Sequence, residues 1–435
     1  MKTQESILKG AFFFLGASIL VKGIRFIQSI ITANVFGVSS ELDTFFIAFN
    51  ISMLPVNVLF FAMQAVLVTT LSQVSKDGEE KVSRFVTESL ILSVAISLLS
   101  GIAIIPLAWI FMPFLAPGFN ETLRSNVIDI LIQLFPFIII SGPAWILTGV
   151  LQSKKRFFSS AIIPGITPLL TVLFLFTFKN SIGIKLFVIC MCVGILFEFL
   201  LSFWILNRTK ILSRITFNIS KECRKLAGES FILSIGTFLM FCTSLVEQAF
   251  ATLSGSGGIS ILYYGMRLPY LLIALSAVPL GASILSHFSE LLAKSEKKEC
   301  ARVWAKYTLV SLIISVPVVA VLIWLSKELV ALLFAGGSFG IIEIEKVTAV
   351  QQLFLLQLPA YIGMVISQRL LTAMNQNKIV GAISGFSLLS ILILNAILEP
   401  HLGLSGVALS TSMMYWIAFS ISAGSAFRIV KSKSV

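Results

Sequence analysis

The sequence has 435 residues, of which 57% are hydrophobic and only 12% are charged, and its mean hydropathy is +0.99. A soluble domain carries about 25% charged residues, so this composition excludes an ordinary water-soluble protein and indicates a chain that folds in a bilayer. The net charge of +12 does not indicate a nucleic-acid-binding protein, because the basic residues lie in short loops and no RNA- or DNA-binding motif accompanies them.

Apolar segments of about 20 residues or more, each long enough to cross the ~30 Å hydrocarbon core, recur along the whole chain. The first is too long for the core of a signal peptide, so we expect it to be retained as a span. Twelve spans are predicted, over residues 8–33, 43–72, 85–113, 126–151, 158–178, 185–206, 226–251, 259–289, 305–326, 347–370, 379–398 and 403–427. The fold class is therefore an all-α integral membrane protein with about twelve transmembrane helices.

The basic residues predict how these spans are oriented. Loops on one side, together with both termini, carry 24 of the 32 Lys and Arg residues, whereas the opposite loops carry five. Loops rich in Lys and Arg remain in the cytoplasm, so both termini are predicted to be cytoplasmic. This orientation also requires an even number of spans.

The chain resembles itself at an offset near 220 residues, which predicts two repeats of six helices. The matched segments are 114–119 with 334–339, 133–135 with 352–354, and 161–165 with 382–385. The predicted parts are an N-terminal half (1–206), a basic cytoplasmic linker (207–225) and a C-terminal half (226–435). Because six is even, the halves form parallel repeats, and a substrate cavity is expected at the centre between them.

Three cationic residues lie within apolar segments, where a charge costs free energy of membrane insertion. Lys22 and Arg25 lie in the first span and Arg267 lies in the eighth, and a charge at that depth costs roughly 2.5–3.5 kcal/mol. Lys22, Arg25 and Gln28 follow each other at intervals of three residues, so they share one face of a helix. An excess of cations over buried acids predicts an anionic substrate, phosphate especially.

Asp43 and Asn50, seven residues apart, form a matching polar face on the second span. One interpretation is that Asp43 belongs to the same substrate site. The alternative is that it forms a buried ion pair with an arginine and merely locks the halves together.

Oxygen-bearing residues of the second half form another set, comprising Glu247, Asn395, Glu399, Val407 and Thr411. Hard oxygen ligands without sulfur or imidazole suit Na⁺ or a similar cation. The alternative is that Glu399, at a helix end beside a proline, is simply solvated.

Two further acidic residues, Glu198 and Glu229, are candidates for buried proton carriers. The five cysteines and two histidines show neither a disulfide framework nor the spacing of a zinc site, so no other cofactor is predicted.

Several segments resemble one family of transporters. Residues 36–37 (FG), 42–49 (LDTFFIAF), 256–268 (SGGISILYYGMRL), 333–339 (LFAGGSF) and 403–411 (GLSGVALST) are similar to the MurJ/MviN lipid II flippases. These belong to the multidrug/oligosaccharidyl-lipid/polysaccharide exporter superfamily. The resemblance runs over nearly the whole chain.

The resemblance implies a cation-lined cavity that binds the pyrophosphate of an undecaprenyl-linked sugar. It places Lys22 on a cavity arginine, Asp43 on an essential aspartate, and Ser260 and Arg267 on a cavity serine and arginine. It also places a sodium site on Glu247, Asn395, Glu399, the carbonyl group of Val407, and Thr411.

The chain departs from the family pattern in the first two spans and in length. Gln28 stands where the family has a second arginine, and Val56 and Asn57 stand where an arginine pair is usual. The family commonly has fourteen spans, whereas twelve are predicted here.

The predicted function is translocation of a polyprenyl-pyrophosphate-linked saccharide, with lipid II as the first candidate, across the cytoplasmic membrane of a bacterium by alternating access. The alternatives are an O-antigen or exopolysaccharide translocase and a multidrug/cation antiporter, which would need acidic cavity walls. An intramembrane glycosyltransferase would need a catalytic constellation facing water, and the outer loops are too short for one. The predicted partners are the lipid-linked substrate and membrane lipid, without nucleic acid, and a monomer is favoured.

Overall fold

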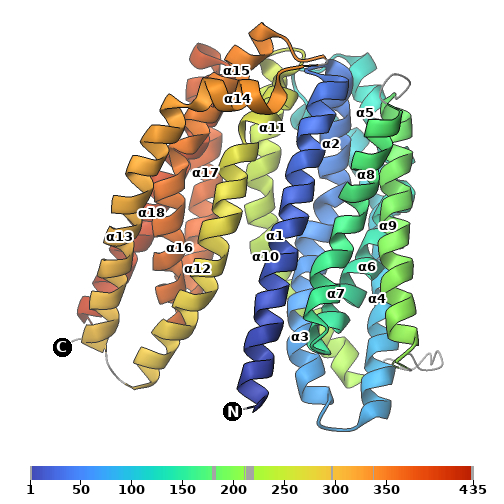
Figure 1. Ribbon diagram of the computed structural model, residues 1–435, viewed down its shortest axis with the longest axis vertical. Helices are drawn as coiled ribbons and strands as arrows, with labels where there is room; N and C mark the ends of the chain where they lie inside the picture. Colours follow the sequence, from blue (N-terminus) through green and yellow to red (C-terminus); the bar gives the residue numbers. More distant parts are fainter. Residues whose placement is uncertain are drawn as a thin grey trace. The chain divides into compact units, whose positions relative to one another are not determined.

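The computed structural model describes residues 2–178, 183–209, 211, 220–294, 297–336 and 338–432 (Figure 1). These residues are almost entirely helical, and the β-type pairing found among them is an isolated bridge between Gly336 and Phe339. Part of the predicted linker, residues 210 and 212–219, lies outside the described residues. The predicted all-α fold is confirmed.

The first half of the chain forms α1 (Lys2–Phe36), α2 (Ser40–Pro55), η1 (Val56–Phe60), α3 (Phe61–Val74), α4 (Glu79–Leu115), α5 (Glu121–Gln133), α6 (Phe135–Ser153), α7 (Phe157–Ile162), η2 (Ile163–Gly165), α8 (Ile166–Thr177) and α9 (Ile184–Asn207). The second half forms α10 (Lys221–Leu253), α11 (Gly258–Gly265), α12 (Arg267–Ala293), α13 (Lys297–Trp324), α14 (Ser326–Phe334), α15 (Ile341–Leu355), α16 (Gln357–Ala373), α17 (Asn377–Leu402) and α18 (Leu404–Ser432).

Within the described ranges, twelve helical segments are long and apolar enough to cross a membrane, so the predicted number of spans is confirmed. The protein is a multi-pass membrane protein. One boundary differs from the prediction, because residues 126–133 belong to the separate helix α5 rather than to the fourth span. Leu134 separates α5 from α6, and Pro136 near the start of α6 favours a new helix there.

Four spans contain a break between two α-helices, and a proline lies at or near each break. Span two passes through the π-helix η1 after Pro55, and span five passes through the 3₁₀-helix η2, which contains Pro164. Span eight breaks at Met266 before Pro269, and span ten breaks at Leu356 before Pro359. Proline removes a backbone donor and crowds the preceding turn, which accounts for the position of these breaks.

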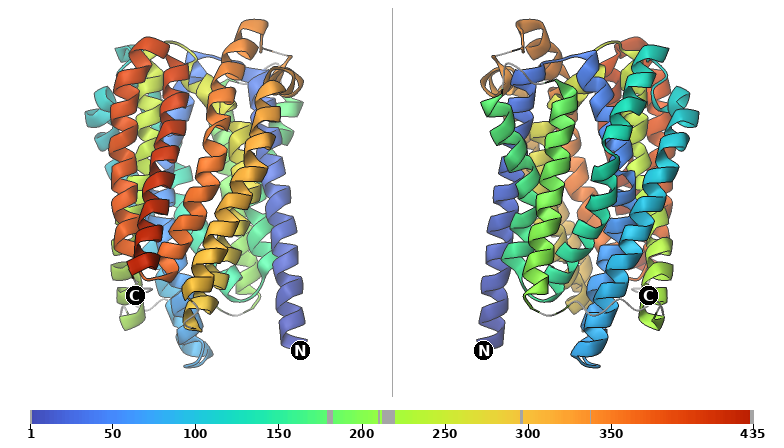
Figure 2. Two further views of the ribbon diagram at one scale, coloured as in Figure 1. Left: turned by 90° about the vertical axis from the view of Figure 1, so that its left-hand side faces the viewer. Right: turned by 90° about the vertical axis from the view of Figure 1, so that its right-hand side faces the viewer.

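The contacts divide the chain into two compact units. Unit 1 comprises residues 1–35, 40–115 and 119–241, and unit 2 comprises residues 36–39, 116–118 and 242–435. The core of unit 1 includes Phe60 and Phe85, and the core of unit 2 includes Phe288. Figure 2 shows α8 beside α9 in unit 1 and α17 beside α18 in unit 2. The predicted halves and cavity stay predictions.

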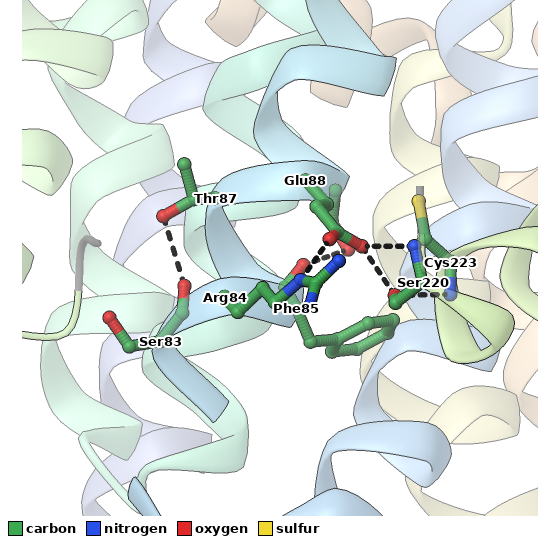
Figure 3. Close-up of polar contacts among 8 residues, drawn as sticks. Ser83, Arg84, Phe85, Thr87, Glu88, Ser220 and Cys223 are labelled. Atoms are coloured by element: carbon green, nitrogen blue, oxygen red, sulfur yellow. Dashed lines mark hydrogen bonds and ion pairs between the residues drawn. The ribbon is translucent and has the colours of Figure 1, made fainter. Parts of the chain in front are cut away.

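Helix α10 contributes residues to both units, since the division falls between Phe241 and Cys242. Its first turn is attached to α4 within unit 1 (Figure 3). The buried carboxylate of Glu88 accepts hydrogen bonds from Arg84 Nε at 2.7 Å, from the backbone N–H of Ser220 at 3.0 Å, and from the Ser220 hydroxyl. The Ser220 Oγ in turn accepts a bond from the Cys223 N–H at 3.2 Å, so Ser220 caps α10 while Glu88 holds the cap.

Candidate functional site

The polar stripe of α1 does not lie in one environment. Lys22 and Gln28 are partly buried, whereas Arg25 between them is exposed. The guanidinium of Arg25 donates a hydrogen bond from Nη2 to the carbonyl oxygen of Pro164 at 3.3 Å. One of the predicted substrate ligands therefore already contacts the break in the fifth span.

Glu198 of α9 contacts the same break from another helix. Its side chain is buried, and one carboxylate oxygen accepts a hydrogen bond from the backbone N–H of Thr167 at 2.9 Å. The predicted burial of Glu198 is confirmed. That of Glu229 is wrong, because Glu229 is half-exposed and lies 3.8 Å from Lys225 in a surface ion pair.

Asp43 lies in the first turn of α2, with acidic Glu41 beside it, and its side chain is fully buried. A carboxylate at this position is stabilised by the partial positive charge of the helix N-terminus. Asn50 lies two turns further along α2 and is partly buried. The predicted shared face of these two residues fits the continuous helix between Ser40 and Pro55.

In unit 2, Arg267 is the first residue of α12, directly after the break at Met266. Its guanidinium carbon lies 3.3 Å from the centre of the Tyr263 ring, which is one turn earlier in α11. This cation–π contact contributes about 0.5–2 kcal/mol. The tyrosine ring therefore restricts where the guanidinium of Arg267 can lie. Ser260 lies on α11 and is fully buried.

The neighbouring Tyr264 fixes α11 within unit 2. This ring is fully buried against Phe334 and Phe339, and its hydroxyl donates to the carbonyl oxygen of Gly37 at 3.3 Å. Gly37 has a φ of +60°, and a Cβ there would lie 2.6 Å from the Ser338 carbonyl oxygen, so this position requires glycine. The break that carries Arg267 is thereby held by aromatic packing on one side and by a tight loop on the other.

The oxygen-rich set of unit 2 is partly assembled. The Thr411 hydroxyl donates to a carboxylate oxygen of Glu247 at 2.7 Å, and its oxygen lies 3.2 Å from the carbonyl oxygen of Val407. Glu399 is only 9% exposed and accepts a hydrogen bond from Ser254 Oγ at 3.1 Å, so the alternative that Glu399 is solvated is wrong.

Asn395 is the member of this set that points most directly to a ligand. Its side chain is fully buried, and neither its amide nitrogen nor its carbonyl oxygen has a hydrogen-bond partner. A buried amide without partners is costly, so such a group calls for a ligand or water. Gly406 allows α17 and α18 to approach closely, since a Cβ there would lie 2.4 Å from the Leu398 carbonyl oxygen. This approach sets Asn395 at about the depth of Thr411 on the antiparallel neighbour.

The donor set fits a hard cation. Carboxylate, amide, hydroxyl and carbonyl oxygens from α10, α17 and α18 are available, and over the described residues there is no group of three or more His, Cys, Asp or Glu side chains that could hold a metal ion. An Na⁺ ion needs no such group, because neutral oxygens suffice for a monovalent ion.

Sequence reasoning missed two contacts of this site. Tyr263 could have been found, because it precedes Arg267 by four residues and therefore lies on the same helical face. The carbonyl group of Pro164 could not, because it lies 139 residues from Arg25 along the chain.

Three comparisons place the chain among known proteins. The sequence model of the family described as lipid II flippase MurJ matches residues 32–428. A probable lipid II flippase MurJ from Buchnera aphidicola subsp. Schizaphis graminum is 24% identical over 414 residues, covering 91% of this chain and 78% of that protein. The one from Aquifex aeolicus is 23% identical, covering 82% of this chain and 70% of that protein.

Two solved structures share the fold. The inward closed conformation of lipid II flippase MurJ matches with a TM-score of 0.79 at 21% identity, covering 95% of this chain and 87% of that one. The inward-facing conformation of a multidrug resistance MATE family transporter of the MOP superfamily matches with a TM-score of 0.77 at 15% identity, covering 97% and 98%. Since both structures share this arrangement of helices, the fold by itself does not separate the two substrate classes.

Proposed function

Because the chain belongs to the lipid II flippase MurJ family, whose sequence model matches residues 32–428, we propose that it translocates lipid II across the cytoplasmic membrane of a bacterium. The family match over nearly the whole chain is the observation that carries this proposal. The protein acts as a transporter rather than as an enzyme, and its substrate is a saccharide linked through pyrophosphate to a polyprenyl lipid.

The substrate's pyrophosphate is bound by cationic and polar side chains that lie in apolar spans. The candidate side chains are Lys22 and Gln28 of α1 within unit 1 and, considered separately, Ser260 and Arg267 within unit 2. Arg267 is suited to phosphate because its planar donors form paired, charge-assisted hydrogen bonds, and Tyr263 holds that plane in place. A multidrug/cation antiporter would require acidic groups at these positions.

Asp43 and Asn50 of α2 are the further candidates for substrate binding within unit 1. Asn50 is the partly exposed member and can donate to or accept from the saccharide hydroxyls, whereas the buried Asp43 orients the first turn of the helix. Transport follows alternating access, in which the differential affinity of the two states for the substrate shifts their populations. The basic loops and both termini face the cytoplasm, as the positive-inside rule requires.

A coupling cation, Na⁺ in the first instance, would be held by Glu247, Asn395, Glu399, the Val407 carbonyl group and Thr411. The support is the buried, unpartnered amide of Asn395 and the Thr411–Glu247 contact at 2.7 Å. When bound, such an ion supplies positive charge that neutralises Glu247, which would otherwise be a costly charge within a span.

The test of this function is rescue of cells that have been depleted of their own lipid II flippase. The expected result is restored growth together with export of lipid II, measured by external labelling of the saccharide. Restoration of O-antigen export without lipid II export would identify a translocase of another lipid-linked oligosaccharide. Failure of both, with the protein present in the membrane, would contradict the proposal.

A further inference from the structure

The fifth span is broken at Pro164 and Pro168, and the break leaves backbone groups without helical partners. Pro168 has no N–H, so the carbonyl of Pro164 cannot accept the usual bond from four residues ahead. The carbonyl of Ile163 accepts instead from Ile166, in the 3₁₀ pattern of η2, which leaves the N–H of Thr167 without that acceptor. Within a bilayer each unsatisfied group costs several kcal/mol, so both must be satisfied by other parts of the protein.

Two side chains of opposite charge satisfy them. Arg25 of α1 donates to the Pro164 carbonyl at 3.3 Å, and Glu198 of α9 accepts from the Thr167 N–H at 2.9 Å. The guanidinium of Arg25 therefore donates to the carbonyl that lacks a helical donor, and a carboxyl oxygen of Glu198 accepts from the N–H that lacks a helical acceptor.

Two glycines let these helices approach the break closely enough. A Cβ on Gly165 would lie 2.7 Å from Val21 Cγ2 of α1, and a Cβ on Gly194 of α9 would lie 2.8 Å from the Thr167 Cα. Val21 precedes Arg25 by four residues and Gly194 precedes Glu198 by four, so each charged side chain lies on the helical face that makes the close contact. The break of the fifth span is therefore contacted closely by α1 at Gly165 and by α9 at Thr167.

We propose that Arg25 and Glu198 are a positioning pair that holds the break of the fifth span and fixes the rotation of α1, so that Arg25 aligns Lys22 and Gln28 for the substrate without binding it. This inference deepens the proposed function, on which its transport readout rests. It accounts for the presence of Arg25 midway between two side chains of the proposed site. It also assigns the guanidinium of Arg25 to the backbone carbonyl of Pro164 rather than to the pyrophosphate.

The test is a double-mutant cycle with Arg25→Gln, Glu198→Gln and the double variant, reconstituted in vesicles that contain lipid II. Each single variant is expected to lower the flipping rate about tenfold, as for loss of a charged hydrogen bond, and the double variant is expected to be no slower than the worse single one. The lipid II content that gives half the maximal rate should change only slightly, and by the same factor, in Arg25→Gln and Glu198→Gln, because both variants act only through alignment of α1. The matched control, Lys22→Gln on the same stripe, should raise this content several-fold.

Additive losses of rate, with a half-saturating content that rises in Arg25→Gln as it does in Lys22→Gln, would overturn the inference and make Arg25 a substrate ligand. The same cycle is measured on the thermal unfolding midpoint in detergent, where coupling between the two sites is expected and strict additivity would likewise overturn the pair. If the wild type moves no lipid II, the proposed function fails, while the unfolding cycle still decides the pair. Arg25→Lys, which keeps a charged donor, should fold and retain most of the wild-type rate, and its loss of rate would also count against a positioning role.

Discussion

At the scale of single residues, the cations within apolar spans differ in what surrounds them. The guanidinium carbon of Arg267 lies 3.3 Å from the centre of the Tyr263 ring, whereas Arg25 donates a hydrogen bond to the Pro164 carbonyl. Stacking preserves the in-plane donors of a guanidinium, and a carbonyl contact uses one of them. Residues of the same chemical type in the same protein are therefore suited to different tasks.

Replacement of Arg267 by alanine is expected to lower lipid II flipping by at least a hundredfold, because two charge-assisted hydrogen bonds to phosphate, each contributing about 1.5–3 kcal/mol, are lost. The measurement is the initial flipping rate in vesicles, normalised to folded protein. The control is Lys327→Ala, since Lys327 is 64% exposed and pairs only loosely with Glu345 at 3.7 Å. Normal flipping by both Arg267→Ala and Lys22→Ala would rule out the proposed phosphate site.

At the scale of helices, close packing and end contacts decide how the spans are arranged within each unit. Gly165 admits α1 to the fifth span, and Glu88 ties the cap of α10 to α4. In both contacts a small or polar residue lies between two helices, and a bulky or apolar side chain at that position would push the helices apart. Each contact can be tested by a single substitution.

Gly165→Ala should destabilise the protein by about 1–3 kcal/mol, because its new methyl group would lie 2.7 Å from Val21 Cγ2. Val21→Ala in the same chain removes that atom and should restore much of the loss. The measurement is the unfolding midpoint in detergent, compared with Gly385→Ala, where a Cβ meets no atom within 4 Å. A Gly165→Ala variant as stable as Gly385→Ala would show that α1 does not pack here.

The contact between Glu88 and Ser220 can be followed through Cys223, a buried thiol three residues beyond the helix cap. Glu88→Gln removes the charge that orders both Ser220 donors, so the first turn of α10 should fray and Cys223 should react several-fold faster with a maleimide. Cys300 in unit 2, also buried, is the matched control whose reactivity should not change. Equal changes at both thiols would indicate general unfolding rather than release of this cap.

At the scale of the whole molecule, binding of the coupling ion is expected to raise the free energy of unfolding. A ligand that binds the folded state alone raises the free energy of unfolding by mass action, by about 2.7 kcal/mol at one hundred times its dissociation constant. The buried amide of Asn395 and the Glu247–Thr411 contact lie in unit 2, and α10 continues from there into unit 1.

Na⁺ should therefore raise the unfolding midpoint in detergent progressively with concentration, and Glu247→Ala should remove this dependence. The comparison is K⁺ at equal ionic strength, which controls for screening of surface charge. Equal stabilisation by K⁺, or a full sodium response in Glu247→Ala, would mean that no specific sodium site exists and would favour coupling to protons or to the membrane potential.

The sequence by itself determined the number of spans, because water-to-bilayer transfer depends on composition over about 20 residues and not on neighbours. It also located the charges that are costly at membrane depth, including Lys22, Arg25 and Arg267. Burial of Glu198 followed from the same reasoning, whereas Glu229 lies near the start of α10, where exposure depends on where the helix emerges from its neighbours.

Only the tertiary structure determined which atoms each charged side chain contacts. The contacts of Arg25 with Pro164 and of Glu88 with Ser220 join residues more than 130 positions apart. These contacts depend on the rotation of each helix about its axis and on where a proline leaves backbone groups without helical partners. An apolar span carries little hydrophobic periodicity, so its sequence does not fix that rotation. The same limit applies to Asn395, whose burial without partners emerges from the close approach of α17 and α18 at Gly406.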